Sequence, residues 1–228
     1  MKKSLLALSL LTALSAAQAQ STDTLKKIKD TGTITLGVRE SSGALAYTLG
    51  GGKYVGFHTE MSERVAADLR RKLGLSSLTV KYQPVTSQNR IPLVQNGTVD
   101  LECGSTTNNT ARQKDVDFAY TTYVEEVRIL TKANSGINGI ADLKGKTVAT
   151  TTGTTSVQLL RKHEKATGVN FEEVFGKDHA DSFLLLESGR ADAFVMDGQI
   201  LAGNIAKAKR APILKTQSFA VLIGVRFN

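Results

Sequence analysis

The sequence predicts an α/β protein with largely parallel strands, built as two lobes with a cleft between them. Strand-like and helix-like segments alternate along the chain in two series, which is typical of α/β architecture. A short polar stretch at residues 133–136 separates the two series and indicates a crossover. The turns after several expected strands are rich in Arg, Ser and Thr, and ligands of open α/β sheets bind beyond such strand ends.

The first series follows from hydrophobic periodicity. Apolar residues recur at helical spacing from Met61 to Leu73, and β-branched runs mark the strands. Gly97 ends a short helix, and the glycines at residues 50–52 are typical of a hairpin turn. The expected strands are residues 33–38, 78–82 and 99–103, and the expected helices are residues 61–73 and 89–96.

The second series repeats the alternation after Lys132. The expected strands are residues 146–150, 170–175 and 193–196, and the expected helices are residues 156–165, 178–188 and 198–209. The predicted organisation is therefore a first lobe over residues 20–131, a second lobe over 132–210 and a tail over 211–228.

The first residues have the three parts of a secretory signal peptide. Lys2 and Lys3 make the start positive, residues 5–14 are apolar, and residues 17–19 supply the small side chains that a signal peptidase needs. We expect residues 1–19 to be removed during export to the periplasm; a signal anchor or a buried helix is the alternative. No later segment is long and apolar enough to span a bilayer, so we expect a soluble mature protein.

The bulk composition narrows the class of partner. The formal net charge is +8 and falls to +6 when Lys2 and Lys3 are removed. This balance favours anionic partners, although most basic residues lie on apparent helix faces, where a solvated surface is the ordinary interpretation. Because the chain has no Trp and only 6% aromatic residues, it offers no stacking platform for nucleic acid.

Cysteine and histidine give no metal or catalytic pattern. The single Cys103 excludes an internal disulfide, and we interpret it as a buried apolar side chain, with a free thiol as the alternative. His58, His163 and His179 are far apart and have no metal-ligand spacing with Cys103. We therefore expect no metal and no cofactor.

The turns at the expected strand ends have the chemistry of an anion receptor. Arginine offers a planar fork of donors that matches a carboxylate. Hydroxyls and backbone N–H groups at helix starts add further donors. The turns in question are residues 39–42, 86–90, 104–107 and 152–155, together with Asp197.

Longer motifs across these turns resemble a known family. They are residues 86–93 (TSQNRIPL), 95–98 (QNGT), 102–109 (ECGSTTNN), 39–42 (RESS), 153–156 (GTTS), 177–183 (KDHADSF) and 187–191 (ESGRA). In these motifs, over roughly residues 25–210, the chain is similar to the periplasmic glutamate/aspartate-binding proteins of ABC transporters, which are bacterial extracellular solute-binding proteins.

The resemblance implies a fold and a function. The expected fold is the two-lobed type II periplasmic binding protein fold, with two hinge strands and the ligand cleft between the lobes. The expected function is capture of L-glutamate or L-aspartate by a monomer that delivers it to the membrane permease of an ABC transporter.

The resemblance also assigns roles to single residues. For the amino-acid head, Arg112, Thr154 and Thr155 match the α-carboxylate donors, and Asp197 matches the acceptor of the α-ammonium. The loop of Gly104 and Thr106 helps to hold both head groups. For the acidic side chain, the matching residues are Arg39, Ser87, Arg90 and His179. A neutral ligand leaves buried arginines uncompensated, which is costly.

Each assignment has a plainer alternative. The arginines could pair with surface carboxylates, and His179 could be a hydrogen-bonded core residue. Asp197, Thr154 and Thr155 could simply cap helices. An enzyme on the same fold, dehydratase-like, is the alternative function; its candidate acids are Asp197 and, more weakly, Glu40.

The tail departs from the family pattern. Family members return to the first lobe after the last helix of the second lobe and finish in a helix, whereas residues 211–228 are apolar and have no helical pattern. The departure indicates an altered or shortened C-terminus, in which these residues could still form the returning hinge strand. The alternative is a truncated, non-functional family member.

Overall fold

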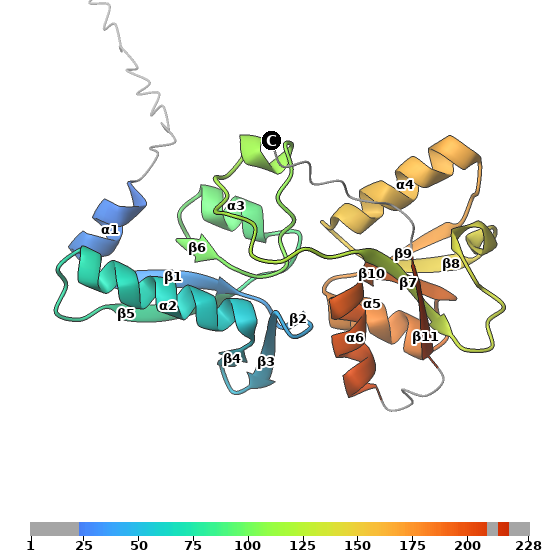
Figure 1. Ribbon diagram of the computed structural model, residues 1–228, viewed down its shortest axis with the longest axis horizontal. Coiled ribbons are helices and arrows are strands. Elements are labelled where there is room, and N and C mark those ends of the chain that lie inside the picture. Colours follow the sequence, from blue (N-terminus) through green and yellow to red (C-terminus); the bar gives the residue numbers. More distant parts are fainter. Residues whose placement is uncertain (1–22, 209–213, 219–228) are drawn as a thin grey trace, which may run out of the picture.

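Two α/β bodies lie side by side in the computed structural model, which describes residues 23–208 and 214–218 (Figure 1). The expected signal peptide, residues 1–19, and most of the expected tail lie outside the described residues. The two-lobed α/β arrangement that the alternating segments predicted is confirmed, with a separate sheet in each body.

The first body is built on a parallel three-stranded sheet with the order β5-β1-β6. Its central strand carries the core, because Ile34, Leu36 and Val38 are buried and pack in one cluster with Ile28 and Ala66 from two helices. The elements are α1 (Thr24–Thr31), β1 (Thr33–Val38), α2 (Phe57–Lys72), β5 (Thr79–Pro84), α3 (Arg90–Gln95), β6 (Leu101–Glu102) and the 3-10 helix η1 (Arg112–Lys114).

A small antiparallel sheet, β2-β3-β4, projects from this body. Its strands are β2 (Ser41–Ser42), β3 (Ala46–Gly50) and β4 (Lys53–Val55). Gly50, Gly51 and Gly52 have φ angles of 82°, 59° and 77°, so the tight turn between β3 and β4 uses backbone conformations that favour glycine. The hairpin turn expected there is confirmed, while the strands themselves are too short for their alternation to be recognised.

The second body has a five-stranded sheet with the order β11-β7-β10-β8-β9. Strands β8, β9 and β10 run parallel, and β7 runs antiparallel to both β10 and β11. The elements are β7 (Val127–Lys132), the 3-10 helix η2 (Ile140–Leu143), β8 (Thr147–Thr151), α4 (Thr155–Thr167), β9 (Glu172–Gly176), α5 (His179–Glu187), β10 (Ala193–Asp197), α6 (Gly198–Lys207) and β11 (Leu214–Ser218).

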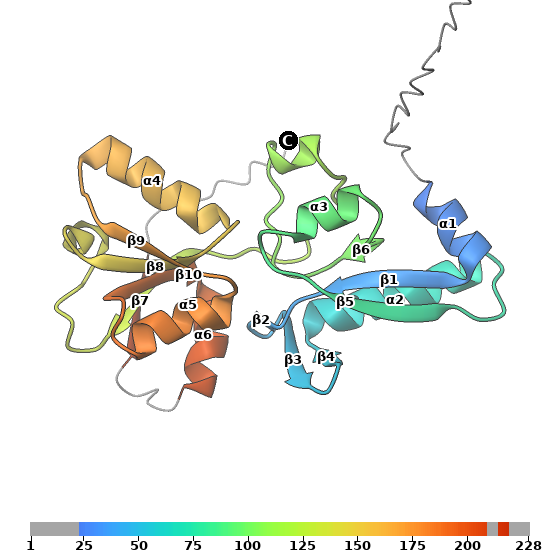
Figure 2. The same ribbon diagram turned by 180° about the vertical axis from the view of Figure 1, so that it is seen from behind.

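Helices cover both faces of the five-stranded sheet, as seen from behind (Figure 2). Val195 of β10 packs in a cluster with Leu160 of α4, whereas the preceding Phe194 packs in another cluster with Leu186 of α5 and Leu201 of α6. Successive strand residues point to opposite faces, so a strand buried on both sides is apolar throughout. This explains why residues 193–196 were recognisable as a strand.

Strand β7 was not predicted, and it changes the expected lobe boundary. The second lobe was expected to begin at residue 132, but β7 begins at Val127 and pairs with β10 from Val127 to Thr131. The second sheet therefore begins at Val127. Strand β11, in the expected tail, lies at the edge of the same sheet and runs antiparallel to β7. Because β7 leads the chain into the second body, β11 runs back towards the side on which the chain entered.

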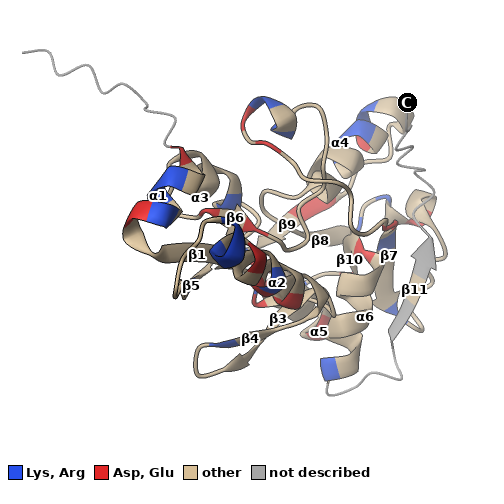
Figure 3. Ribbon diagram, turned by 60° about the vertical axis from the view of Figure 1, so that its left-hand side comes forward, with Lys and Arg blue, Asp and Glu red and all other residues tan. Residues whose placement is uncertain are grey.

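Charged residues gather on the helices (Figure 3). The basic run at the end of α2, Arg70, Arg71 and Lys72, is exposed, in agreement with the solvated helix face that was expected. No helix in the described part of the chain is long and apolar enough to cross a membrane. Cys103, expected to be buried, is only half-buried, and the strand expected at residues 99–103 is limited to Leu101–Glu102.

The two bodies contact each other through β2 and α6. Gly43, in the turn after β2, has a φ of 59°, and a Cβ there would lie 2.5 Å from the carbonyl oxygen of Gln199. Farther along α6, the ammonium of Lys207 lies 4.8 Å from the centre of the Tyr47 ring in β3. Backbone approach this close shows that the bodies are closed on each other.

We expect Gly203→Ala to open this contact. A Cβ at Gly203 would lie 2.5 Å from the Cα of Gly43, so the bodies must separate, even though alanine favours the helix itself by up to about 1 kcal/mol. Small-angle X-ray scattering should show a larger radius of gyration. Ala202→Gly, at an exposed site on α6, is the control and should lower the melting temperature without changing the radius. An unchanged radius in Gly203→Ala would contradict the closed contact.

Candidate functional site

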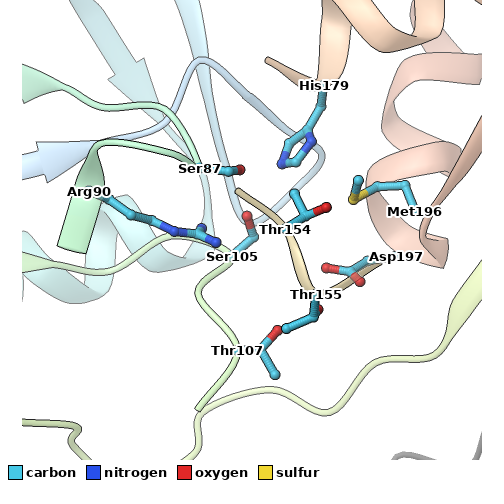
Figure 4. A pocket seen from close by; sticks show the side chains of 9 residues that line it. All are labelled: Ser87, Arg90, Ser105, Thr107, Thr154, Thr155, His179, Met196 and Asp197. Carbon is cyan, nitrogen blue, oxygen red and sulfur yellow. The ribbon is translucent and has the colours of Figure 1, made fainter. Parts of the chain in front are cut away.

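A cavity lies between the two bodies (Figure 4). Six of the ten residues expected to bind ligand line it, and three further residues join them. The expected six are Ser87, Arg90, Thr154, Thr155, His179 and Asp197; the three to which no individual role was assigned are Ser105, Thr107 and Met196. The side chains come from strand ends and helix starts of both bodies, which is where the sheet geometry places ligand contacts.

Arg90 forms the cationic end of the cavity. It is the first residue of α3, in the turn after β5, where the Asn89 side chain accepts a hydrogen bond of 2.8 Å from the backbone N–H of Thr86. Its side chain is 3% exposed, and Nε and Nη1 have no hydrogen-bond partner among the described residues. Burial lowers the pKa of Arg90 to about 9, so the group is charged at neutral pH. A buried cation with unused donors favours an anionic ligand.

Arg39 lies behind this wall and is not part of the cavity lining. It follows β1, is 0% exposed, and its Nη1 donates a 3.0 Å hydrogen bond to Oγ of Ser87. Its Nη2 donates to Asp178 of the second body. Nε has no partner in the described structure. Ser87 therefore presents to the cavity a hydroxyl that a buried arginine holds in place.

The loop after β6 places alternate side chains on opposite sides. Ser105 and Thr107 line the cavity, whereas Thr106 turns away and donates a 2.6 Å hydrogen bond to Oε2 of Glu102. A Cβ at Gly104 would lie 2.6 Å from Cγ of Arg39, so the loop approaches the arginine closely only because this residue is glycine. In an extended chain, successive side chains point to opposite sides. This rule could have indicated that Ser105 and Thr107 point to one side and Thr106 to the other.

The start of α4 forms the wall in the second body. Thr154 occupies the N-cap position, and its hydroxyl donates a 2.8 Å hydrogen bond to the carbonyl oxygen of Thr151. Gly153 has a φ of 80°, and a Cβ there would lie 2.6 Å from the Cα of Gln88 in the first body. The N-terminus of α4, with Thr155, is thus brought against the first body, and helix N-termini attract carboxylates.

Arg112 bridges the two bodies beside the cavity. Its Nη1 donates to the carbonyl oxygen of Thr107 at 2.9 Å, and its Nη2 donates to that of Gly153 at 3.1 Å. The side chain is half-buried, and burial lowers its pKa. Arg112 does not line the cavity, but it fixes the backbone of the loops that do.

His179, the first residue of α5, is 1% exposed. Its Nδ1 lies 3.0 Å from Oγ1 of Thr151, which in turn lies 2.8 Å from Oγ of Ser182. Nε2 has no partner among the described residues. Burial, followed by the charges of Arg39 and Arg90, holds the pKa of His179 well below its ordinary value, so the imidazole is neutral at pH 7.

Asp197 forms the anionic end of the cavity. It is the last residue of β10, is half-buried, and makes no capping hydrogen bond to α6. Burial and then the charge of Glu125 raise its pKa to about 6, against the lowering effects of Arg90 and Arg112. With Arg90 on one side and Asp197 on another (Figure 4), the cavity presents one cationic and one anionic group, a charge pattern that fits a zwitterion.

These observations define a class of protein, the two-lobed solute-binding protein. Residues 34–183 match the bacterial extracellular solute-binding proteins, family 3, and the chain belongs to this family. The sequence resemblance to the family and the expected type II fold are thereby confirmed.

Two curated relatives and a solved structure narrow the comparison. The chain is 51% identical over 193 residues to the L-glutamate/L-aspartate-binding protein of Pseudomonas aeruginosa, covering 83% of this chain and 63% of the relative. It is 48% identical over 205 residues to the glutamate/aspartate import solute-binding protein of Escherichia coli, covering 87% and 68%. An ancestral arginine-binding protein bound to glutamine matches with a TM-score of 0.70 and 28% identity, covering 82% of this chain and 78% of that one. The chain spans about two thirds of the length of these curated relatives.

We expect Asp197→Asn to stabilise the ligand-free protein in a pH-dependent way. The raised pKa of Asp197, about 6, means that its ionised form opposes folding. The penalty is absent below the ordinary carboxyl pKa of about 4 and complete above pH 6, where it amounts to at most about 3 kcal/mol. The variant should therefore melt at a higher temperature than wild type at pH 7.5 and at the same temperature near pH 4. Equal stabilisation at both pH values would show that the charge is not the cause.

Proposed function

We propose that this protein captures L-glutamate or L-aspartate in the cavity between its two bodies. The observation that carries the proposal is Arg90, a buried guanidinium with two unpaired nitrogens at a cavity wall. The names of the relatives from Pseudomonas aeruginosa and Escherichia coli, both glutamate/aspartate-binding, support the same ligands.

The charge pattern orients the ligand. The side-chain carboxylate meets Arg90, Ser87 and Nε2 of His179, and Arg39 supports this end through its hydrogen bond to Ser87. The α-ammonium meets Asp197 at the other end.

The α-carboxylate lies between these two ends. It meets Thr155 and the N-terminus of α4, where Thr154 is the N-cap. Ser105 and Thr107 add hydroxyl donors from the first body. Arg112, Gly104 and Thr106 hold the loops around this head group in shape.

Binding is coupled to closure because the cavity walls belong to different bodies. A ligand that contacts Arg90 in one body and Asp197 in the other binds the closed form better, and so shifts the equilibrium towards it. We infer that the closed form, a monomer exported to the periplasm by way of residues 1–19, is recognised by the permease of an ABC transporter.

Discrimination against neutral amino acids follows from the same arginine. Glutamine is close to glutamate in shape, but its amide has no negative charge to offset the buried guanidinium. The uncompensated charge costs several kcal/mol. The affinity for the acidic ligand should therefore exceed the affinity for glutamine by more than their similar shapes would predict.

An enzyme on the same fold is not favoured. Acid–base catalysis requires a second positioned group, and Glu40, the weaker candidate, is exposed and absent from the cavity lining. The relatives are binding proteins by name, which also supports a binding role.

Isothermal titration calorimetry tests the proposal directly. Wild-type protein should bind L-glutamate or L-aspartate and bind L-glutamine at least about 100-fold more weakly. Arg90→Gln should lower the affinity for the acidic ligands by about 100-fold or more, because a charge-assisted hydrogen-bond pair is lost, without lowering the melting temperature of the ligand-free protein. Arg161→Gln, at an exposed arginine paired with Glu173, is the control and should bind as wild type. Absence of binding by folded wild-type protein would overturn the proposal.

The affinity should also depend on pH through Asp197. The α-ammonium binds the ionised carboxylate, whose pKa is about 6 in the free protein. The affinity should therefore be constant above pH 7 and fall as the pH drops below 6, by up to about tenfold per pH unit. Titrations near pH 6 in buffers of different ionisation enthalpy should show proton release on binding. Asp197→Asn should bind weakly and without this proton release; release that persists in the variant would assign the proton to another group.

A further inference from the structure

Outside the cavity lining, a carboxylate of the second body reaches two side chains of the first. Asp178 immediately precedes α5, and its side chain is 17% exposed. One carboxylate oxygen accepts a hydrogen bond from Nη2 of Arg39, and the other accepts one of 2.7 Å from Oγ of Ser41. The two bodies are thus joined by an ion pair and a charge-assisted hydrogen bond at a single residue.

Ser41 completes the connection in the reverse direction. Its Oγ accepts a 3.2 Å hydrogen bond from the backbone N–H of Ala180, in the first turn of α5. The first N–H groups of a helix have no partner within the helix, and here one of them is satisfied by a hydroxyl of the other body. Within its own body, the backbone N–H of Asp178 donates to Oδ2 of Asp181, so the start of α5 is fixed on both sides.

The connection continues to the cavity wall through Arg39. This side chain is 0% exposed, and while Nη2 meets Asp178, Nη1 donates to Oγ of Ser87, which lines the cavity. Asp178 therefore neutralises one of the two buried arginines of this region and leaves Arg90 with unused donors. None of Arg39, Ser41 and Asp178 lines the cavity, and their contacts join the two bodies without a ligand between them.

We propose that Asp178 is a positioning residue that draws the two bodies together and fixes the Arg39–Ser87 pair before the ligand arrives. The bond network forms only when the bodies are closed, because its partners belong to different bodies. It therefore contributes to closure in the ligand-free protein and slows opening in the liganded protein. A contact of this kind changes the dissociation rate more than the association rate.

The first test measures closure without ligand. In a Cys103→Ser background, Ala67→Cys on α2 and Lys162→Cys on α4, both exposed positions, carry spin labels for distance measurement by electron paramagnetic resonance. Asp178→Asn keeps the size of the side chain and removes its charge. We expect the closed distance population to fall and longer distances to appear in the ligand-free variant. A distribution identical to that of the parent protein would overturn the proposal.

The second test measures ligand kinetics by stopped flow. Asp178→Asn should raise the dissociation rate of L-glutamate by about tenfold or more and change the association rate by less than about threefold. A dissociation rate equal to that of wild type would overturn the proposal. Asp181→Asn, which removes the same charge from the same helix turn but contacts only its own body, is the control and should leave distances and rates unchanged.

Ser41→Ala provides an independent variant if Asp178→Asn does not fold. It removes the hydrogen bonds to Asp178 and Ala180 but leaves the Arg39–Asp178 ion pair, so it should shift the distances in the same direction by a smaller amount. Unchanged distances in a folded Ser41→Ala protein would count against the proposal. Because the distance measurement needs no ligand, its failure is distinguishable from a failure of wild-type protein to bind glutamate.

Discussion

The site depends on the buried positive charge of Arg90. The guanidinium is 3% exposed and two of its nitrogens have no partner within the described structure, so the ligand-free protein carries an electrostatic cost that an anion can relieve. Its neighbours fit this interpretation, since Arg39 is neutralised by Asp178 and His179 is uncharged. In the proposed function an acidic ligand relieves this cost. The charges of Glu102 and Asp197 act on Arg90, but Nε and Nη1 have no hydrogen-bond partner among the described residues.

The two sheets bring the remaining groups to this arginine. Arg90 follows β5 in one body, while Thr155 and Asp197 follow β8 and end β10 in the other, so each functional side chain stands at the carboxyl end of a strand, where open α/β sheets bind ligands. Glycines at positions 43 and 153 let the backbones of the two bodies approach closely. The same packing therefore forms the cavity and links its two walls, which makes closure part of recognition.

The sequence analysis identified the segments in which apolar residues recur at a regular spacing. It missed the segments whose structure depends on contacts with other parts of the chain. The strand at residues 193–196 was recognisable because it is buried on both faces. Strand β7 was not, because it lies antiparallel between β10 and β11 outside the βα alternation that guided the prediction. In the site, Thr106 was expected and Ser105 and Thr107 were found, since the direction in which each side chain of a loop points is set by the contacts around it.

The sequence by itself determined the α/β class, the family resemblance and the donor-rich turns that are proposed to bind an anion, because hydrophobic period, glycine positions and turn composition are local properties of the chain. The tertiary structure decided how the donors are used. Arg39 and Arg90 are both arginines at strand ends, but Asp178 from the other body occupies the first and no described residue pairs with Nε or Nη1 of the second. Which charge remains for a ligand depends on contacts between residues far apart in sequence, and these exist only when the two bodies are folded and closed.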